Sequence, residues 1–287
     1  MAVDILQEKI RKTKNPTMLE ICFGKEDIPG AVLEEAGSLT EACAAYCRVL
    51  LTGLKDIVPA VRFSFASFAV LGAEGMTVLG ASLAAAKKLG YYVALDAPEL
   101  LSPKAAALAA GTLFDWPVDG LIISGYPGSD VIKPFLTGCK EGKKDIFVVA
   151  RTANKSAPEL QDLLAGGRLV HAAAADHVNR YGADTAGKFG YTRVGILASA
   201  SAAQSLKDLR AKYPMLFMIL DGADYPNANA KNCANGFDKF GHGAVAVVGD
   251  SICAAWKQAE GECDPVEAAR EAALRMKKNL NRYVTVL

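Results

Sequence analysis

Eight short apolar runs, separated by segments of helical character, place the strongest constraint on the fold of this chain. Each run is continuous rather than alternating, as expected for strands that are buried on both faces of a parallel sheet. The runs are Met18–Phe23, Ala60–Phe65, Tyr91–Leu95, Gly120–Ile123, Ile146–Ala150, Val194–Ala198, Leu216–Leu220 and Ala244–Val248. This repeat predicts a (β/α)8 barrel, a fold of typically ~250 residues. An open doubly wound sheet shows the same alternation and is the alternative.

The segments between the runs carry local signals for helix ends. A helix over 38–54 is expected to start with a capping box formed by Ser38 and Glu41. The last helix is expected to start with Asp264 as its cap and Pro265 in its first position. We predict one barrel domain over 1–287, with an added helix near the start of the chain at residues 4–12.

Composition excludes several classes of protein. The 32 basic and 31 acidic residues leave a net charge of +1, without the basic excess typical of a protein that grips nucleic acid. The seven cysteines include no CxxC pair and indicate reduced core thiols. No apolar stretch approaches the ~18 residues of a membrane span. With no nucleotide-cradling motif present, we expect no cofactor, no nucleic-acid or membrane partner, and a cytoplasmic location.

In such a barrel, side chains at the carboxyl ends of the strands point into one mouth. The residues selected by this rule are Lys25 and Glu26, Arg62 and Ser64, Asp96 and Glu99, Ser124 and Tyr126, Arg151, Thr152 and Asn154, Ser199 and Ser201, Asp221 and Asp224, and Asp250 with Ser251. Polar residues so close to buried strands indicate a functional site, because burying a charged group costs free energy unless the group has a partner or a functional role.

Each candidate also has a structural explanation. Asp96 can cap a turn or pair with Arg62. The mostly polar segment 151–154 can simply be a solvent-exposed loop. The three histidines, His171, His177 and His242, do not have metal-ligand spacing and are interpreted as non-catalytic, with His242 at the opposite end of the barrel.

The acidic residues after the last two strands suggest a separate alternative. Asp221, Asp224 and Asp250 offer the oxygen ligands that hard cations prefer. The same carboxylates would repel a phosphate dianion, which barrels often bind in these two loops. Solvated carboxylates and turn caps are the simpler interpretation.

Several segments together resemble the orotidine 5′-phosphate decarboxylase family in its longer bacterial form. They are DILQEKIRKTKNP at the start, FSFASFAVLGAEGMTVL after the second strand, GYYVALDA at the third, DGLIISGYPGSDVIKPFL at the fourth and DIFVVARTANKSAPELQDL at the fifth. The resemblance runs over most of the chain and independently implies a barrel. It also implies a homodimer.

Most of the catalytic residues that the resemblance implies are replaced in this chain. The resemblance implies a signature Asp-x-Lys-x-x-Asp, in which Asp96 matches the first Asp, Pro98 stands at the Lys that protonates the carbanion, and Leu101 stands at the second Asp. Arg62 replaces a second-strand Lys and is a poorer proton donor.

Other positions differ as well. Ala153 stands where a Ser would contact the pyrimidine, and Ile252 lies where an Arg would grip the phosphate. The first-strand region also lacks the Asp expected to bind the ribose.

Three hypotheses follow. The first is a divergent family member that has lost decarboxylation of orotidine 5′-phosphate to UMP and binds another small ligand, phosphorylated or not, or a protein partner. The second is an active decarboxylase or lyase of pyrimidine nucleotide biosynthesis that uses Asp96, Arg62 and Glu99. The third is a metal-assisted enzyme that uses the three late aspartates. The expected ligand-binding residues are Ser124, Tyr126, Arg151, Thr152, Asn154, Asp221, Asp250 and Ser251.

Overall fold

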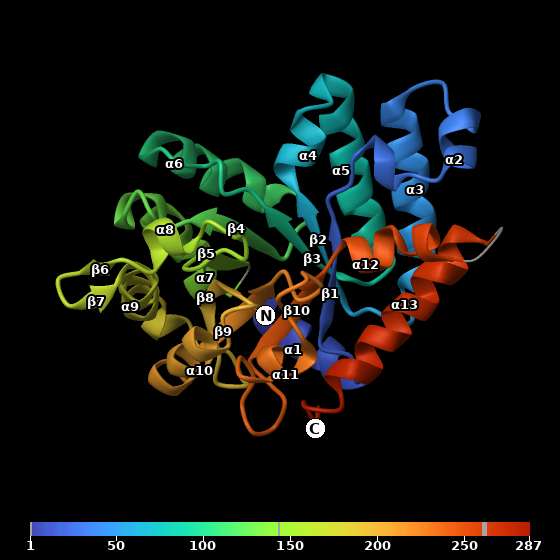
Figure 1. Ribbon diagram of the computed structural model, residues 1–287. Coiled ribbons are helices and arrows are strands. Elements are labelled where there is room, and N and C mark those ends of the chain that lie inside the picture. The colour runs from blue at the N-terminus through green and yellow to red at the C-terminus, as the bar shows by residue number, and fades with distance from the viewer. Residues whose placement is uncertain (1, 143, 260–262) are drawn as a thin grey trace.

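The computed structural model describes residues 2–142, 144–259 and 263–287, and its centre is a closed barrel of eight parallel strands (Figure 1). The order around the barrel is β1-β10-β9-β8-β5-β4-β3-β2, and β1 pairs with β10 to close it. The strands are β1 (Thr17–Ile21), β2 (Ala60–Ser64), β3 (Tyr92–Asp96), β4 (Gly120–Ser124), β5 (Asp145–Val149), β8 (Thr192–Ser199), β9 (Leu216–Asp221) and β10 (Ala244–Val248). All eight predicted strands are confirmed, and the open-sheet alternative is wrong.

Helices surround the barrel and alternate with its strands (Figure 1). They are α1 (Ala2–Thr13), α2 (Gly30–Glu35), α3 (Leu39–Leu54), α4 (Phe65–Ala69), α5 (Gly72–Lys88), α6 (Pro103–Thr112), α7 (Leu136–Lys140), α8 (Pro158–Gln161), α9 (Val170–Gly182), α10 (Ala203–Lys212), α11 (Ala230–Ala234), α12 (Asp250–Cys253) and α13 (Pro265–Leu280). A small hairpin of β6 (Leu164–Ala165) and β7 (Arg168–Leu169) follows α8. Among the described residues, no helix combines the length and the apolar character needed to cross a membrane.

The predicted helix caps are present. Ser38 Oγ accepts a hydrogen bond from the Glu41 amide at 3.2 Å, and Asp264 accepts one from the Val266 amide at 2.8 Å. The capping box at α3 differs from the expected one in a single respect. The Glu41 carboxylate accepts from the Gly37 amide at 2.8 Å, one residue before the cap.

Large and small side chains alternate inside the barrel. The rings of Phe147 on β5 and Phe217 on β9 meet edge to face, with their centroids 6.1 Å apart. A Cβ added to Gly195 on the intervening β8 would lie 2.4 Å from the Phe217 carbonyl oxygen and 2.8 Å from the Phe147 ring. Glycine at this position therefore provides the space that the two aromatic rings fill.

The added helix α1 closes the amino end of the barrel. Its Val3, Leu6 and Ile10 are buried. Its Gln7 accepts a hydrogen bond from the Gly243 amide at 3.1 Å, next to the start of β10. Since this end is sealed, the carboxyl ends of the strands are left as the open mouth.

Candidate functional site

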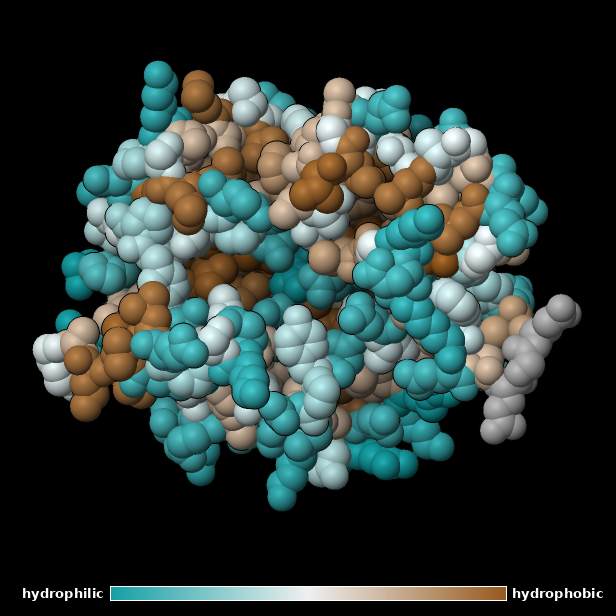
Figure 2. Space-filling model, turned by 45° about the horizontal axis from the view of Figure 1, so that its top comes forward, coloured by the Kyte–Doolittle hydropathy of each residue, from teal (hydrophilic) through white to brown (hydrophobic). Residues whose placement is uncertain are grey.

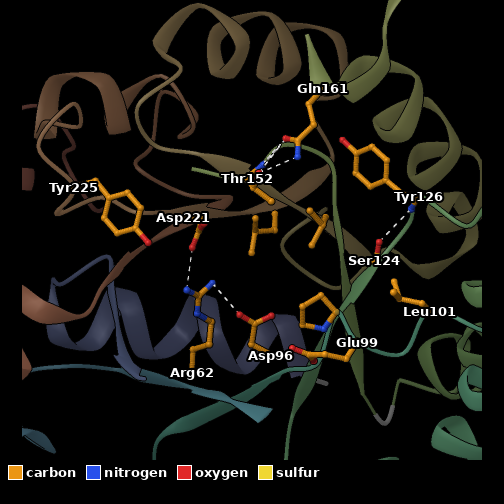
Figure 3. A pocket seen from close by; sticks show the side chains of 13 residues that line it. Arg62, Asp96, Glu99, Leu101, Ser124, Tyr126, Thr152, Gln161, Asp221 and Tyr225 are labelled. Carbon is orange, nitrogen blue, oxygen red and sulfur yellow. Dashed lines mark hydrogen bonds and ion pairs between the residues drawn. The ribbon is translucent and has the colours of Figure 1, made fainter. Parts of the chain in front are cut away.

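A cavity of about 410 Å³ opens at the carboxyl ends of the strands. Figure 2 shows a hollow near the centre of this face, where hydrophobic and hydrophilic surfaces meet. The cavity is lined by Arg62, Asp96, Pro98, Glu99, Leu101, Ser124, Tyr126, Val149, Thr152, Gln161, Leu197, Asp221 and Tyr225 (Figure 3). Seven of the residues selected from the strand ends are therefore brought together here, as the barrel geometry requires.

The guanidinium of Arg62 is the centre of the charged wall (Figure 3). Its Nη2 donates to the carboxylate of Glu20 on β1 and lies 2.9 Å from Oδ1 of Asp221 on β9. Its Nη1 lies 3.5 Å from Oδ2 of Asp96 on β3. The predicted pairing of Asp96 with Arg62 is thus present, but it is the longest of the three contacts.

Three carboxylates around one guanidinium leave this wall with an excess of negative charge. Burial, together with the neighbouring carboxylates of Asp221, Glu20 and Glu99, raises the pKa of Asp96 to about 7 against the opposing effect of Arg62. Burial likewise raises the pKa of Glu20. Near neutral pH the cluster therefore readily takes up a proton, because its single cation does not balance its carboxylates.

The opposite wall is polar at its rim and apolar below. Hydrogen bonds join Thr152 and Gln161: the Thr152 amide donates to Gln161 Oε1 at 2.8 Å, and Gln161 Nε2 donates to the Thr152 hydroxyl oxygen at 2.9 Å. The hydroxyl of Tyr126 donates to the carbonyl oxygen of Ala150 at 2.8 Å, which fixes its ring at the edge of the cavity. Val149 and Leu197 supply apolar surface.

Pro98 and Leu101 also line the cavity. They occupy the two positions at which the family resemblance implies a lysine and a second aspartate. Leu101 is 53 % exposed, so a large apolar side chain stands at the rim where a charged group is expected.

Four predicted ligand-binding residues do not line the cavity, and two of them, Arg151 and Asn154, lie in the loop after β5. Both side-chain nitrogens Nε and Nη2 of Arg151 lie 2.9 Å from the carboxylate of Asp162, and His171 Nδ1 lies 3.1 Å from the same carboxylate. Asn154 is exposed and donates to Ser156 Oγ at 2.9 Å. Arg151 therefore holds the loop after β5 in place, and Asn154 is part of that loop's surface.

The loops after β9 and β10 are tied to each other. One oxygen of the Asp224 carboxylate accepts hydrogen bonds from the amide of Gly249 at 2.9 Å and from that of Ser251 at 3.1 Å. Ser251 lines a separate cavity between α11 and α13, and neither it nor Asp250 lines the mouth. The two residues were predicted to bind ligand, and this stays a prediction, although neither lines the mouth cavity.

The metal hypothesis required Asp221, Asp224 and Asp250 to converge. Asp221 instead pairs with Arg62, and Asp224 is bound to backbone amides. Within residues 2–142, 144–259 and 263–287, no group of three histidine, cysteine or acidic side chains is placed to hold a metal ion.

Sequence reasoning missed three residues of the site. Glu20 lies inside the first apolar run, where a lone carboxylate in a buried strand was itself a usable signal, because such a group needs a partner. Gln161 lies in α8, and Tyr225 in the loop after β9, away from the strand ends. No local pattern marks these last two.

Fold and site together define a (β/α)8-barrel protein with a cavity built from the ends of its strands. Residues 94–271 match the model of the orotidine 5′-phosphate decarboxylase / HUMPS family. The chain belongs to this family.

Relatives agree with this assignment, and a solved structure agrees with the fold. The orotidine 5′-phosphate decarboxylase of Clostridium novyi (strain NT) is 25% identical over 98% of this chain and 99% of its own. That of Rhodopirellula baltica is 27% identical over 85% of both chains. The Leishmania donovani UMP synthase structure superimposes with a TM-score of 0.78 at 22% identity, covering 98% of this chain and 57% of that one.

Proposed function

We propose that this barrel binds a small molecule in its mouth and does not decarboxylate orotidine 5′-phosphate. The observation that carries the proposal is the composition of the cavity wall. Among the described residues that line it there is no lysine, and the one guanidinium, that of Arg62, contacts three carboxylates. The homodimer and the cytoplasmic location implied above stay predictions.

Loss of carbon dioxide leaves a carbanion, which needs a proton donor beside it. Pro98 has no proton to give at the position that the resemblance assigns to the donor. Arg62 is a poor proton donor, because its guanidinium keeps its proton throughout the accessible pH range. The three surrounding carboxylates raise the pKa of Arg62 still further, against the opposing effect of burial.

Among the described residues that line the mouth, no side-chain cation is free to receive the phosphate of the nucleotide. Arg151 is engaged by Asp162, whose carboxylate also lies 3.1 Å from Nδ1 of His171. The backbone amides of Gly249 and Ser251, which lie in the loop where barrels often bind phosphate, already donate to Asp224. A phosphate group brought to this loop would therefore meet a carboxylate instead of free donors.

An active decarboxylase is the second candidate, favoured by the name that the full-length relatives carry. In that case Asp96, whose pKa is raised to about 7, would supply the proton, and Arg62 and Glu99 would position the substrate. The two candidates make opposite predictions for one assay.

The assay follows the ultraviolet absorbance of orotidine 5′-phosphate during incubation with the purified protein, with the Clostridium novyi relative as the positive control. We expect a rate at least about 10³-fold below that of the control, since both the proton donor and the charged surroundings of the carbanion are replaced. Turnover that scales with the amount of protein and disappears in D96N would establish the second candidate instead.

A repair variant tests the reason for inactivity. The double substitution Pro98→Lys, Leu101→Asp restores the two signature side chains that the resemblance implies. We expect it to remain inactive, because the phosphate receptor is still missing. Recovered turnover would show that the loops after β9 and β10 do accept the nucleotide.

A further inference from the structure

We infer that the ligand of the mouth cavity is a small organic cation, such as an amine or amidine, whose charged group lies against Asp96 beside Arg62. This inference rests on the proposed function, and it names the class of ligand that the same site takes.

The charge of the wall is the first argument. Arg62 faces Glu20, Asp96 and Asp221, and Glu99 adds a further carboxylate to the lining of the cavity. One cation against four acidic groups favours a positively charged ligand and opposes an anionic one, because burial weakens solvent screening.

The second argument is that the charged cluster is incomplete. The Asp96 side chain is only 20 % exposed, yet within the described part of the chain its carboxylate accepts no hydrogen bond and its nearest cation is 3.5 Å away. Arg62, which is 5 % exposed on its side chain, also has an Nε without an acceptor among these residues. Buried polar groups are normally satisfied, so the open carboxylate of Asp96 calls for a donor on the ligand, and the open Nε–H of Arg62 calls for an acceptor elsewhere on it.

The shape and chemistry of the remaining walls fit a flat cation. Tyr126 and Tyr225 line two sides of the cavity, and aromatic rings attract cations through their faces (Figure 3). Leu197, Val149 and Pro98 add apolar surface for a ring or chain. The volume of about 410 Å³ lies within the range of small-molecule sites.

A matched series of probes tests the sign of the charge directly. Benzamidine, benzamide and benzoate have nearly the same size and shape and carry a positive charge, no charge and a negative charge. Binding to the intact protein is measured by isothermal titration calorimetry at pH 8 with up to about 10 mM probe, a range that detects millimolar affinities. We expect benzamidine to bind at least about tenfold more tightly than benzamide, and benzoate not to bind.

Variants assign the effect to the site. D96N should weaken benzamidine binding by about tenfold, and E99Q, which alters an exposed side chain, by about two- to threefold. The control E271Q removes the same charge from the exposed face of α13 and should leave binding unchanged.

The pH dependence gives an independent reading. Asp96 is surrounded by Arg62, Asp221, Glu20 and Glu99, and its pKa of about 7 means that a cation must displace a proton from it below that pH. Benzamidine affinity should therefore rise by about tenfold from pH 6 to pH 8, since the amidinium stays charged throughout. In D96N this rise should be smaller.

Each outcome is decisive. Benzoate binding as tightly as benzamidine, equal binding of all three probes, or no binding of benzamidine at about 10 mM would overturn the inference. These results are independent of the orotidine 5′-phosphate assay. Turnover in that assay would contradict the proposed function, whereas a wrong charge preference without turnover would contradict only the class of ligand.

Discussion

The Nη2 atom of Arg62 lies 2.9 Å from Oδ1 of Asp221, although two strands, β1 and β10, stand between their own strands in the barrel. The contact reaches across the mouth, so the charged cluster links opposite sides of the fold. A buried pair of this kind contributes little net stability, yet breaking it leaves uncompensated charge behind.

Replacing Arg62 by Met should therefore lower the free energy of unfolding by about 3–5 kcal/mol at pH 7.5. The loss should be smaller near pH 5, because Glu20 and Asp96, whose pKa values are raised, can then bind protons. Urea unfolding at the two pH values measures both effects.

Arg270 provides the control for this variant. It pairs with Asp56 at 2.7 Å, but the Asp56 side chain is 58 % exposed, so R270M should cost only about 0–1 kcal/mol. If R62M costs no more than R270M, the cluster does not have the energetic role described here.

Asp96 should make the protein less stable as the pH rises. The pKa of its carboxyl is about 7 in the folded protein, against about 3.9 in an unfolded chain. Between these values the folded state holds a proton that the unfolded state has lost. The contribution of Asp96 to the free energy of unfolding is therefore greatest below about pH 4 and falls until about pH 7. D96N should remove this component.

The difference in unfolding free energy between D96N and wild type should thus increase by about 4 kcal/mol from pH 4 to pH 8. Urea denaturation across that range measures it. D130N, at an exposed position in the loop after β4, should give a curve parallel to that of wild type. A D96N curve that also runs parallel would contradict the raised pKa.

The packing inside the barrel makes a separate prediction. Gly195→Ala should destabilise the protein by about 1–3 kcal/mol, because its Cβ would overlap the Phe217 backbone and the Phe147 ring. Gly80→Ala is the matched control. Nothing lies within 4 Å of a Cβ at Gly80 in α5, so this change should be neutral or stabilise by up to about 1 kcal/mol. Thermal unfolding of both variants compares them.

Asp224 should stabilise the loops after β9 and β10. D224A leaves the amides of Gly249 and Ser251 without their acceptor and should cost about 1–3 kcal/mol. D224N, whose carbonyl oxygen can still accept, should cost less. Inorganic phosphate at about 10 mM should raise the Tm of D224A more than that of wild type, because free amides bind anions. Equal Tm values for wild type and D224A would show that the carboxylate has no such role.

The eight strands, the helix caps at Ser38 and Asp264, and the family were all predictable from the sequence. Strand and cap signals are local: they depend on continuous apolar runs and on side chains within three residues of each other. Arg62, Asp96 and Asp221 were also within reach, because each stands at the end of a strand and barrel geometry sends such side chains to one mouth.

Tertiary structure decided what those side chains contact. The sequence suggested that Arg151 binds ligand, but in the structure it pairs with Asp162. It suggested a solvated Asp224, but that carboxylate accepts hydrogen bonds from two backbone amides. Glu20, which lies within β1, pairs with Arg62 and so belongs to the charged cluster. Such pairings depend on where distant loops and strands come together in space, and that information is absent from the residues on either side of each position.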